Sequence, residues 1–425
     1  MRILIISYFF PPFNAIGAVR VGKIAKYLSS FGHDVRVVSA RDQPLQPTLE
    51  LEIPETAVTY TRWFNVNRVA ELAVGGRDHV AAHGYRNARL QRVSLTRFAG
   101  QAYKAVLNFP DGEIGWWPHA YRAGAQLCEA WRPDVIYASA RPFTGHLVAA
   151  ALGARYRIPW VAELRDLWVD NPNYPFGGLR KWLERLLERR VYSRVAGFTT
   201  VSQPLASLLE ARYRRPVRVV TNGFDRADYP QVDRCRDAER LDIAYTGMLY
   251  PGKQDLRPLF RALRLMGPMG ERVRVRFFGR YLDSVRTIAA EEGVGHLVEV
   301  HEAVPYAESL RVQGSADLLL LLLWNDPTVR GVFTGKLFEY VGARRPILAT
   351  GPDSSEAADL IRSRSLGVVL GEPEDIASYL RTVLLEKERN GEIADLPESG
   401  TVGLSREEQT RVLESFLLPL AGSAT

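Results

Sequence analysis

One segment in the second half of the chain combines residue types that bind phosphates and sugars. Thr334 and Gly335 precede a predicted helix whose first free N–H groups would attract an anion, and Lys336 adds a positive charge there. Glu339 lies about one turn further on, where its carboxylate can accept hydrogen bonds from two ribose hydroxyls. Together these residues suit a nucleoside diphosphate, although a surface helix with a solvated lysine and glutamate explains the same sequence.

Two further loops in this half place glycine at the end of a predicted strand. Gly247 and Lys253 lie in the loop that opens the first strand–loop–helix unit, and Gly279 and Arg280 follow a later strand. Lys253 and Lys336 together could neutralise a leaving diphosphate, because fixed cations stabilise charge that develops in a transition state. Each lysine taken alone is more typical of a solvent-facing side chain.

The first half of the chain offers a candidate anion-binding loop. Residues 11–20 join the first predicted strand to the first predicted helix, with Gly17 where a ligand can approach the backbone and Arg20 on the first helical turn. The loop lacks the GxGxxG pattern, which weighs against a dinucleotide-dependent oxidoreductase. An ordinary strand–helix turn explains the same residues.

Two polar groups in the first half are candidates for contacts with a sugar. Arg165 and Asp166 follow the predicted strand 160–163 and would bring a guanidinium and a carboxylate to a ligand, unless they pair with each other or with another acid. Asp111 and Trp116 lie close together in the sequence. A tryptophan near a carboxylate suits a sugar, because the ring stacks on the sugar face and the carboxylate bonds its hydroxyls. Such tryptophans are equally often core residues.

These residues depend on predicted strands and helices that alternate along the chain. Strands that are apolar at consecutive positions are typical of sheets covered on both faces, and their alternation with helices predicts parallel, doubly wound sheets. The predicted strands are 3–7, 35–39, 135–138, 160–163, 197–201, 217–221, 242–246, 273–278, 297–301, 317–323 and 347–349.

An interruption of this alternation divides the chain. Residues 226–240 contain many Asp and Arg and few aliphatic side chains, so they predict a linker between a domain at 1–225 and a second at 241–404. A last helix over 405–425, with Ser405 as its N-cap, is assigned to the first domain. Because open α/β sheets bind ligands at the carboxyl ends of their strands, we expect an α/β protein of two Rossmann-like domains facing across a cleft.

Composition excludes several classes of protein. In 425 residues, 46% are hydrophobic and 24% charged, which is typical of globular proteins and not of disordered, collagen-like or coiled-coil chains. The 2 cysteines and 7 histidines lack metal-ligand spacing, so we expect no disulfide framework, no metal and no cofactor. Without a signal-peptide cleavage site or an apolar run of about 18 residues, the sequence indicates a cytoplasmic protein.

The net charge of +7 indicates an anionic partner, and this charge is unevenly distributed. Residues 1–200 hold 26 basic and 16 acidic side chains, whereas the remainder holds 29 and 32. The densest basic stretch, 62–104, is either a solvated helical face or a surface that docks on anionic lipid. Nucleic acid is the less favoured partner, because the stretch lacks the interleaved stacking aromatics of a nucleic-acid module.

Taken in order, the motifs resemble the glycosyltransferases of the GT-B fold, in particular the family 4 retaining enzymes, over nearly the whole chain. The most specific pair is Val201-Ser202-Gln203 followed about 20 residues later by Thr-Asn-Gly-Phe-Asp at 221–225. The other residues that carry the resemblance are 8–12, Gly17, Arg20, 32–35, 245–247, Lys253, 336–340 and 345–348.

The resemblance implies a nucleotide-sugar donor on the C-terminal domain and an acceptor on the N-terminal domain, with retention of configuration and no metal. The bacterial surface-polysaccharide branch is the most similar, which implies a saccharide or lipid-linked acceptor and a location at the inner face of the cell membrane. The sequence departs from the family pattern at three positions. Gly331 replaces a glutamate, Met248 replaces a basic residue, and Arg165-Asp166 stand where many members have a histidine.

The resulting hypothesis assigns roles to the candidate residues. Lys253 and Lys336 stabilise the leaving phosphate, aided by the Gly17 N–H and by Arg20. Glu339 holds the ribose, and Asp166 orients a hydroxyl. Two alternatives remain open: a nucleotide-sugar 2-epimerase on the same fold, and a noncatalytic protein that binds sugar or nucleic acid.

Overall fold

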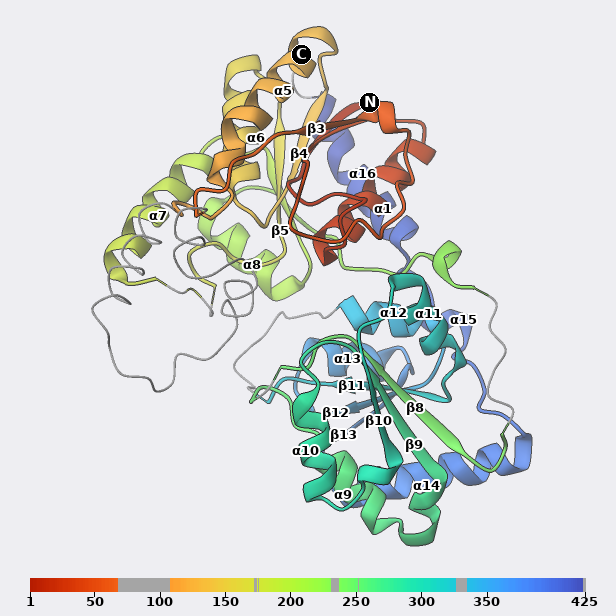
Figure 1. Cartoon of the computed structure of the whole chain (residues 1–425). Coiled ribbons are helices and arrows are strands. Elements are labelled where there is room, and N and C mark those ends of the chain that lie inside the picture. Colours follow the sequence, from red (N-terminus) through yellow and green to blue (C-terminus); the bar gives the residue numbers. More distant parts are fainter. Residues whose placement is uncertain are drawn as a thin grey trace. The chain divides into compact units, whose positions relative to one another are not determined.

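The computed structural model of the chain describes residues 1–67, 108–171, 174, 176–230, 237–250, 252–325 and 335–422. The chain divides into two compact units, Met1–Val220 with Thr410–Thr425 and Thr221–Gln409. The first unit contains a seven-stranded sheet and the second a six-stranded sheet, and every strand pair is parallel. Helices lie on both faces of each sheet (Figure 1).

The first sheet has the strand order β3-β2-β1-β4-β5-β6-β7. Its strands are β1 (Arg2–Ile6), β2 (Asp34–Ala40), β3 (Val58–Thr61), β4 (Val135–Ser139), β5 (Trp160–Leu164), β6 (Gly197–Thr200) and β7 (Val217–Val219). The helices that accompany it are α1 (Ile16–Ser30), α5 (Trp117–Ala130), α6 (Thr144–Tyr156), α7 (Gly178–Tyr192), α8 (Gln203–Tyr213) and most of α16 (Arg406–Gly422).

Side-chain alternation gives the first sheet two separate cores. Ile3 and Ile5 of β1 belong to a cluster with buried residues of α1 and α16. Leu4 and Ile6 of the same strand point to the other face and belong to a cluster with residues of α5 and α6. Burial of both faces explains why β1 is apolar at every position from Ile3 to Ile6.

The second sheet has the order β10-β9-β8-β11-β12-β13. Its strands are β8 (Leu241–Thr246), β9 (Val273–Phe278), β10 (Val298–His301), β11 (Leu318–Leu322), β12 (Ile347–Thr350) and β13 (Gly367–Leu370). The helices of this unit are α9 (Arg257–Leu265), α10 (Asp283–Glu291), α11 (Tyr306–Ser315), α12 (Gly335–Ala343), α13 (Glu356–Ser363), α14 (Pro373–Asn390) and α15 (Glu398–Thr401). One core contains residues of α9, α10 and α14, and the other contains residues of α11, α12 and α13.

The structure confirms the predicted fold class, and each predicted strand is found within two residues at either end. Two strands were not predicted, β3 and β13, and both lie at an edge of their sheet. Helix α16 passes from one unit to the other: it starts at Arg406, and its Leu413, Phe416 and Leu417 are buried in the core of the first unit.

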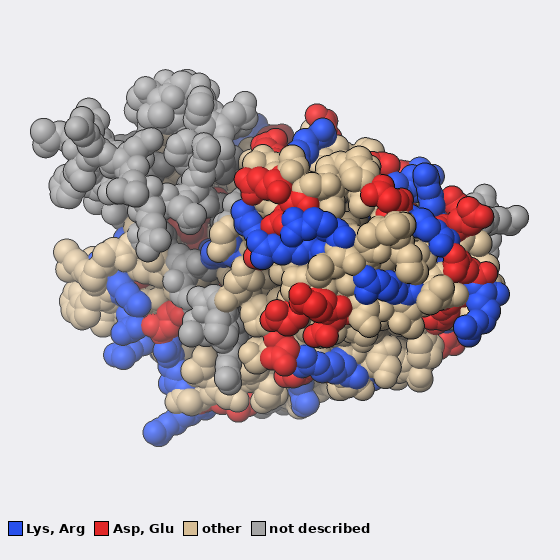
Figure 2. Space-filling model, turned by 90° about the horizontal axis from the view of Figure 1, so that it is seen from below, with Lys and Arg blue, Asp and Glu red and all other residues tan. Residues whose placement is uncertain are grey.

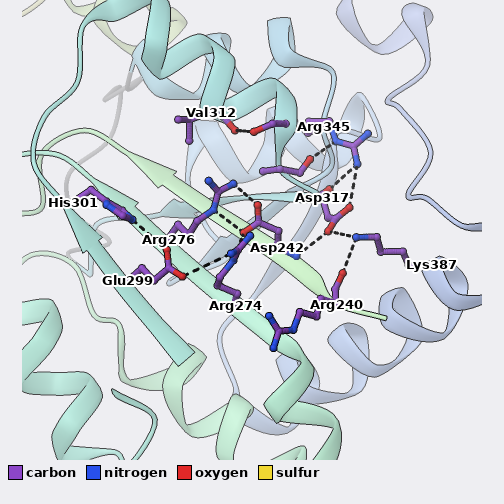
Figure 3. A network of polar contacts seen from close by, with 12 residues as sticks. Arg240, Asp242, Arg274, Arg276, Glu299, His301, Val312, Asp317, Arg345 and Lys387 are labelled. Atoms are coloured by element: carbon purple, nitrogen blue, oxygen red, sulfur yellow. Dashed lines mark hydrogen bonds and ion pairs between the residues drawn. The ribbon is translucent and has the colours of Figure 1, made fainter. Parts of the chain in front are cut away.

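A buried charge network holds the amino-terminal edge of the second sheet (Figure 3). Asp317, which precedes β11, accepts from Lys387 Nζ of α14 over 2.7 Å and from the Asp242 N–H of β8 over 2.8 Å. Asp242 in turn accepts from Arg276 Nε of β9 over 2.8 Å. Because these charged groups are paired with one another, the network fixes β8, β9 and α14 relative to the start of β11. This edge lies opposite to the carboxyl ends of the strands, where such sheets bind ligands.

On one face of the molecule, charges of both signs are mixed (Figure 2). Figure 2 shows basic and acidic side chains interspersed over the face in view, and exposed pairs such as Arg257–Glu291, at 3.2 Å, are of this kind. The predicted basic stretch 62–104 lies outside the described residues from position 68 onward. Of the helices that the model describes, none is both long enough and apolar enough to pass through a bilayer.

Candidate functional site

Each sheet has one point where the strand order reverses, between β1 and β4 in the first and between β8 and β11 in the second. At such a point the connections leave neighbouring strands in opposite directions, which opens a crevice at their carboxyl ends. Candidate residues follow these strands in both units.

In the second unit, the turns after β8 and β9 pack backbone against backbone. The Gly247 N–H donates to the Phe278 carbonyl over 2.7 Å. A Cβ added at Gly279 would lie 2.0 Å from the Gly247 carbonyl oxygen, so only glycine fits there. Gly247 itself has φ +109, a region that favours glycine. The two predicted glycines therefore form one turn pair.

Lys336 lies against this turn pair. Its Nζ donates to the Tyr245 hydroxyl and, over 3.0 Å, to the Met248 carbonyl. The ammonium also lies 4.0 Å from the centre of the Tyr245 ring. A Cβ on Gly247 would lie 2.5 Å from Lys336 Cε, so this glycine leaves the space that the lysine occupies. The first turn of α12 thus brings a cation to the carboxyl end of β8.

Lys336 and Glu339 are both shifted toward their neutral forms. Burial lowers the pKa of Lys336 to about 7, against the opposing effect of the Glu339 carboxylate. Burial raises the pKa of Glu339, although Gln313 Nε2 donates to its Oε2 over 3.1 Å and opposes the shift. A desolvated cation near neutrality gains more from a nearby phosphate than a solvated one, because the local dielectric is low.

The remaining candidates of this unit lie around the same edge. The Lys253 ammonium lies 4.3 Å from the centre of the Trp324 ring, and Trp324 follows β11. Gly335 begins α12, and Arg280 is exposed after β9. Thr334 lies outside the described residues. A pocket of about 240 Å³ adjoins the loop of Lys253, and its lining residues are Leu249, Gly252, Gln254, Asp255, Leu256, Arg257, Ser284, Ile288 and Asn325.

In the first unit, the structure brings Arg165 to the start of α1. Arg165 donates from Nε and Nη2 to the Ala140 carbonyl, over 2.9 and 2.7 Å. A Cβ on Gly17 would lie 3.0 Å from Arg165 Nη2, so the guanidinium lies beside the first turn of the helix. Asp166, the next residue, is exposed. Gly17 and Arg165 thus meet at the carboxyl edge of the first sheet.

Arg20 has a different role from the one predicted. Its guanidinium is 1% exposed, donates from Nε to Glu163 Oε1 over 2.7 Å and donates from Nη2 to the Val220 carbonyl over 2.8 Å. Burial alone would raise the pKa of Glu163, but the charges of Arg20 and Arg165 and the hydroxyl of Ser139 lower it to about 2. The charge of Arg20 is therefore used inside the fold and is not presented to a ligand.

The predicted sugar-binding pair is also placed differently from the expectation. Trp116 is 0% exposed, and its Nε1–H donates to Thr61 Oγ1 over 2.8 Å, so its ring is not available to stack on a sugar. Asp111 accepts from the Thr144 N–H and hydroxyl, over 2.9 and 2.6 Å, which fixes its loop. Its neighbour Glu113 is the second acid of this loop. Burial and the Asp111 carboxyl raise the pKa of Glu113 to about 8.

Two residues at the second edge were not identified from the sequence. Tyr245 fixes the ammonium of Lys336, and Gln313 of α11 bonds both Glu339 Oε2 and, over 2.9 Å, Thr246 Oγ1. Tyr245 lies in an apolar strand, and its sequence pattern indicates only a core position. Gln313 lies on a helix between two unrelated motifs, so no spacing pattern points to it.

Comparison with known proteins agrees with this architecture. Residues 17–223 match the family model described as a glycosyl transferase 4-like domain. No curated protein matches the sequence.

Solved structures share the fold across both units. Sucrose-phosphate synthase from Thermosynechococcus elongatus is 12% identical with a TM-score of 0.60, and each chain is covered over 100% of its length. HepE from Anabaena, in complex with UDP and glucose, is 15% identical with a TM-score of 0.62, covering 99% of this chain and 100% of that one. The lipopolysaccharide outer core galactosyltransferase WaaB is 13% identical with a TM-score of 0.55, covering 99% of both chains.

Proposed function

We propose that this chain is a glycosyltransferase of the GT-B fold with a glycosyl transferase 4-like domain, and that it transfers a sugar from a nucleotide-diphosphate donor to a saccharide or lipid-linked acceptor. The HepE structures hold UDP with glucose, or UDP-glucose, which supports a donor of this class. Transfer with retention and without a metal is part of the proposal, as is a role in polysaccharide synthesis.

The observation that carries the proposal is the position of Lys336. Its ammonium lies at the glycine turn after β8, at the point where the order of the second sheet reverses. A diphosphate bound at the start of α12 would meet this cation together with the free N–H groups of the first helical turn. Glu339, one turn further along α12, would then accept from the ribose hydroxyls.

Sugar transfer requires stabilisation of the leaving phosphate. Sugar transfer passes through an oxocarbenium-like state in which negative charge grows on the departing oxygen. In our proposal, Lys336 and Lys253 stabilise that charge electrostatically, which requires positioned cations and no proton transfer. Gly279 and Arg280 belong to the same donor edge.

The first unit would bind the acceptor and assist the chemistry. Arg165 beside Gly17 offers a guanidinium and helix N–H groups to a phosphate, and exposed Asp166 would orient a hydroxyl. Because Trp116 is buried, acceptor binding by this loop rests on Asp111 and its neighbour Glu113. An anionic membrane surface, contacted through the basic stretch 62–104, would complete the set of partners.

The donor is tested by thermal shift. The protein is melted with UDP, GDP, ADP and their sugars, and the true nucleotide should stabilise by about 2.7 kcal/mol at 100 times its Kd. Stabilisation by none of them would contradict the proposal. An EDTA-treated sample tests independence from metal, and the anomeric proton of the product tests retention.

Substitution at the donor edge tests the assigned residues. Lys336→Ala should reduce transfer by roughly 10²–10³-fold, the loss expected for one transition-state contact, with an unchanged melting profile. Arg311→Ala, an exposed arginine of α11 that is 59% accessible, is the control and should retain activity. Near-normal turnover by Lys336→Ala with the verified donor would overturn the assignment. An epimerase, in contrast, would convert the donor without any acceptor.

A further inference from the structure

Helix α7 of the first unit has an inverted distribution of side chains. Its buried positions include three charged residues, Arg180, Glu184 and Glu188, at intervals of four. Its exposed positions carry four large apolar residues with the spacing i, i+3, i+4 and i+7. These are Leu179, Trp182, Leu183 and Leu186, which are 76%, 57%, 43% and 45% exposed. Soluble proteins seldom expose an apolar stripe of this kind unless something covers it.

The buried charges fix the orientation of α7. Arg180 Nε donates to Glu184 Oε1 over 2.6 Å, and the Trp168 indole N–H donates to Glu184 Oε2 over 3.2 Å. Arg180 also stacks on the Phe176 ring at 3.5 Å and bonds the carbonyl of Asn108. Rotation of the helix to bury its leucines would expose this paired network and break it. The apolar stripe is therefore held at the surface by the packing beneath it.

The exposed charged residues of α7 itself are all basic. The two carboxylates of α7 are Glu184 and Glu188, 1% and 3% exposed, so neither reaches the outer face. Arg189 and Arg190 are exposed at the C-terminal end of the stripe, and Arg185 lies beside Trp182 in a pair with Asp170 at 2.6 Å. Trp182 is three and seven residues before Arg185 and Arg189, which places its indole at the boundary between the apolar and cationic strips.

We propose that α7 docks on an anionic lipid bilayer. The helix lies in the plane of the membrane, with Leu179, Trp182, Leu183 and Leu186 among the acyl chains and with Arg189 and Arg190 on lipid phosphates. An amphipathic helix with leucine and tryptophan on one side and basic residues beside them is typical of interfacial binding, and tryptophan prefers the headgroup level. A helix whose own carboxylates are buried and whose exposed charges are basic complements an anionic surface better than a mixed-charge protein interface.

Helix α7 is a different surface from the stretch 62–104, and its contact with the membrane does not depend on sugar transfer. Lipid binding and sugar transfer to a water-soluble acceptor are measured separately. A negative result in one assay therefore leaves the conclusion from the other unchanged.

The test is sedimentation of the full chain with vesicles, without donor. The wild type should bind vesicles that contain phosphatidylglycerol and should bind pure phosphatidylcholine vesicles weakly. The double variant Leu183→Gln, Leu186→Gln should lose roughly tenfold or more in partition, since two apolar side chains no longer enter the bilayer. The matched control is Leu385→Gln with Leu418→Gln, two leucines that are 50% and 48% exposed on other helices, which should bind like the wild type.

Two further measurements separate the contributions. Arg189→Gln with Arg190→Gln should weaken binding to anionic vesicles and reduce its sensitivity to salt. Brominated lipids should quench part of the fluorescence of the wild type, and the quenching should fall in Trp182→Phe. Equal melting temperatures of all variants are expected, because each substituted side chain is exposed.

Three results would overturn the proposal. The wild type fails to bind anionic vesicles, or the Leu183→Gln, Leu186→Gln variant binds them as the wild type does. In the third, the wild type is a dimer in solution that this double variant dissociates, which would show that the stripe is covered by a second copy of the chain.

Discussion

Lys336 combines a half-buried, largely desolvated ammonium with a pKa of about 7, so the protonation of one residue should govern how donor affinity depends on pH. A diphosphate beside the ammonium favours its charged form and raises its pKa in the complex. Affinity should therefore be highest below pH 7, where the free protein is already protonated. Above that pH it should fall by about tenfold per unit, until the pKa of the complex is reached.

This dependence can be measured with a nucleotide sugar, whose diphosphate has no titration near neutrality. The Kd is determined by calorimetry between about pH 6 and 9. Lys336→Arg is the control: its guanidinium stays protonated over this range, so its profile should be flat. A flat profile for the wild type would show that the lysine is fully charged before the donor binds.

The pair of Arg20 and Glu163 predicts a stability effect at the centre of the first unit. Both side chains are at most 1% exposed, and Glu163→Gln would leave the arginine buried without its counter-ion. Loss of one member of such a pair costs about 3–5 kcal/mol. Of the 8 tryptophans, only Trp324 lies in the second unit, Thr221–Gln409, and the others lie in the first. Tryptophan fluorescence in urea therefore reports mainly the unfolding of the first unit.

Glu291→Gln, in an exposed pair with Arg257, is the comparison and should change stability by less than about 0.5 kcal/mol.

The contribution of Glu163 to the free energy of unfolding should also depend on pH. Because the pKa of Glu163 is lowered from 4.5 to about 2 in the fold, its contribution is complete above pH 4.5 and is lost as the pH falls toward 2. Equal urea midpoints for Glu163→Gln and wild type would contradict this account.

At the level of residues, sequence reasoning found positions more reliably than partners. Lys336 and Gly247 were both identified, and the structure brings them into contact. Arg20 was also identified, but its partner Glu163 is 143 residues away, and no local pattern shows that the two meet inside the sheet. Trp116, a tryptophan near the carboxylate of Asp111 in the sequence, suggested a sugar-binding site, but tertiary packing buries its ring.

At the level of elements, the turn pair after β8 and β9 depends on glycine. A methyl group at Gly279 would lie 2.0 Å from the Gly247 carbonyl oxygen and would force the two turns apart. Gly279→Ala should therefore weaken donor binding at least tenfold, about 1.4 kcal/mol, through displacement of the turn that receives Lys336.

Gly371→Ala is the matched variant for this prediction. Gly371 follows β13 at the same edge of the sheet, and the nearest atom to its added Cβ, the Gly351 carbonyl oxygen, lies at 3.6 Å. Calorimetric titration with the donor compares the two variants with the wild type. Equal affinities for all three would show that the turn pair tolerates displacement.

Strand prediction succeeded where both faces of a strand are buried and failed at the edges. The central strands β1 and β11 are continuous apolar runs, which the sequence shows directly. In the edge strand β3, three residues are half-buried and Thr59 is exposed, and β13 begins at Gly367 with φ +147. Such segments acquire their conformation from the neighbouring strand, so their own composition carries little signal.

At the level of the whole molecule, α16 contributes to the first unit although it begins in the second. Phe416 is 7% exposed, and its ring lies against Gly197 of β6, where a Cβ would be 2.7 Å from Phe416 Cζ. Phe416→Ala should destabilise the first unit by about 3–5 kcal/mol, as measured by tryptophan fluorescence in urea.

Leu418→Ala on the same helix is the control for this prediction, because its side chain is 48% exposed and lies outside the core. It should shift the urea midpoint little. A Phe416→Ala protein as stable as the Leu418→Ala protein would show that α16 contributes no packing energy to the first sheet.

The path of α16 also sets an order of events on the ribosome. The second unit interrupts the first by about 190 residues, from Thr221 to Gln409. At about 5–20 residues per second, the nascent chain spends roughly 10–40 s with β1 to β7 made and Leu413, Phe416 and Leu417 not yet synthesised. During that interval the apolar face of Ile3 and Ile5 has no helix α16 to cover it, which makes this face the natural client surface for a ribosome-associated chaperone.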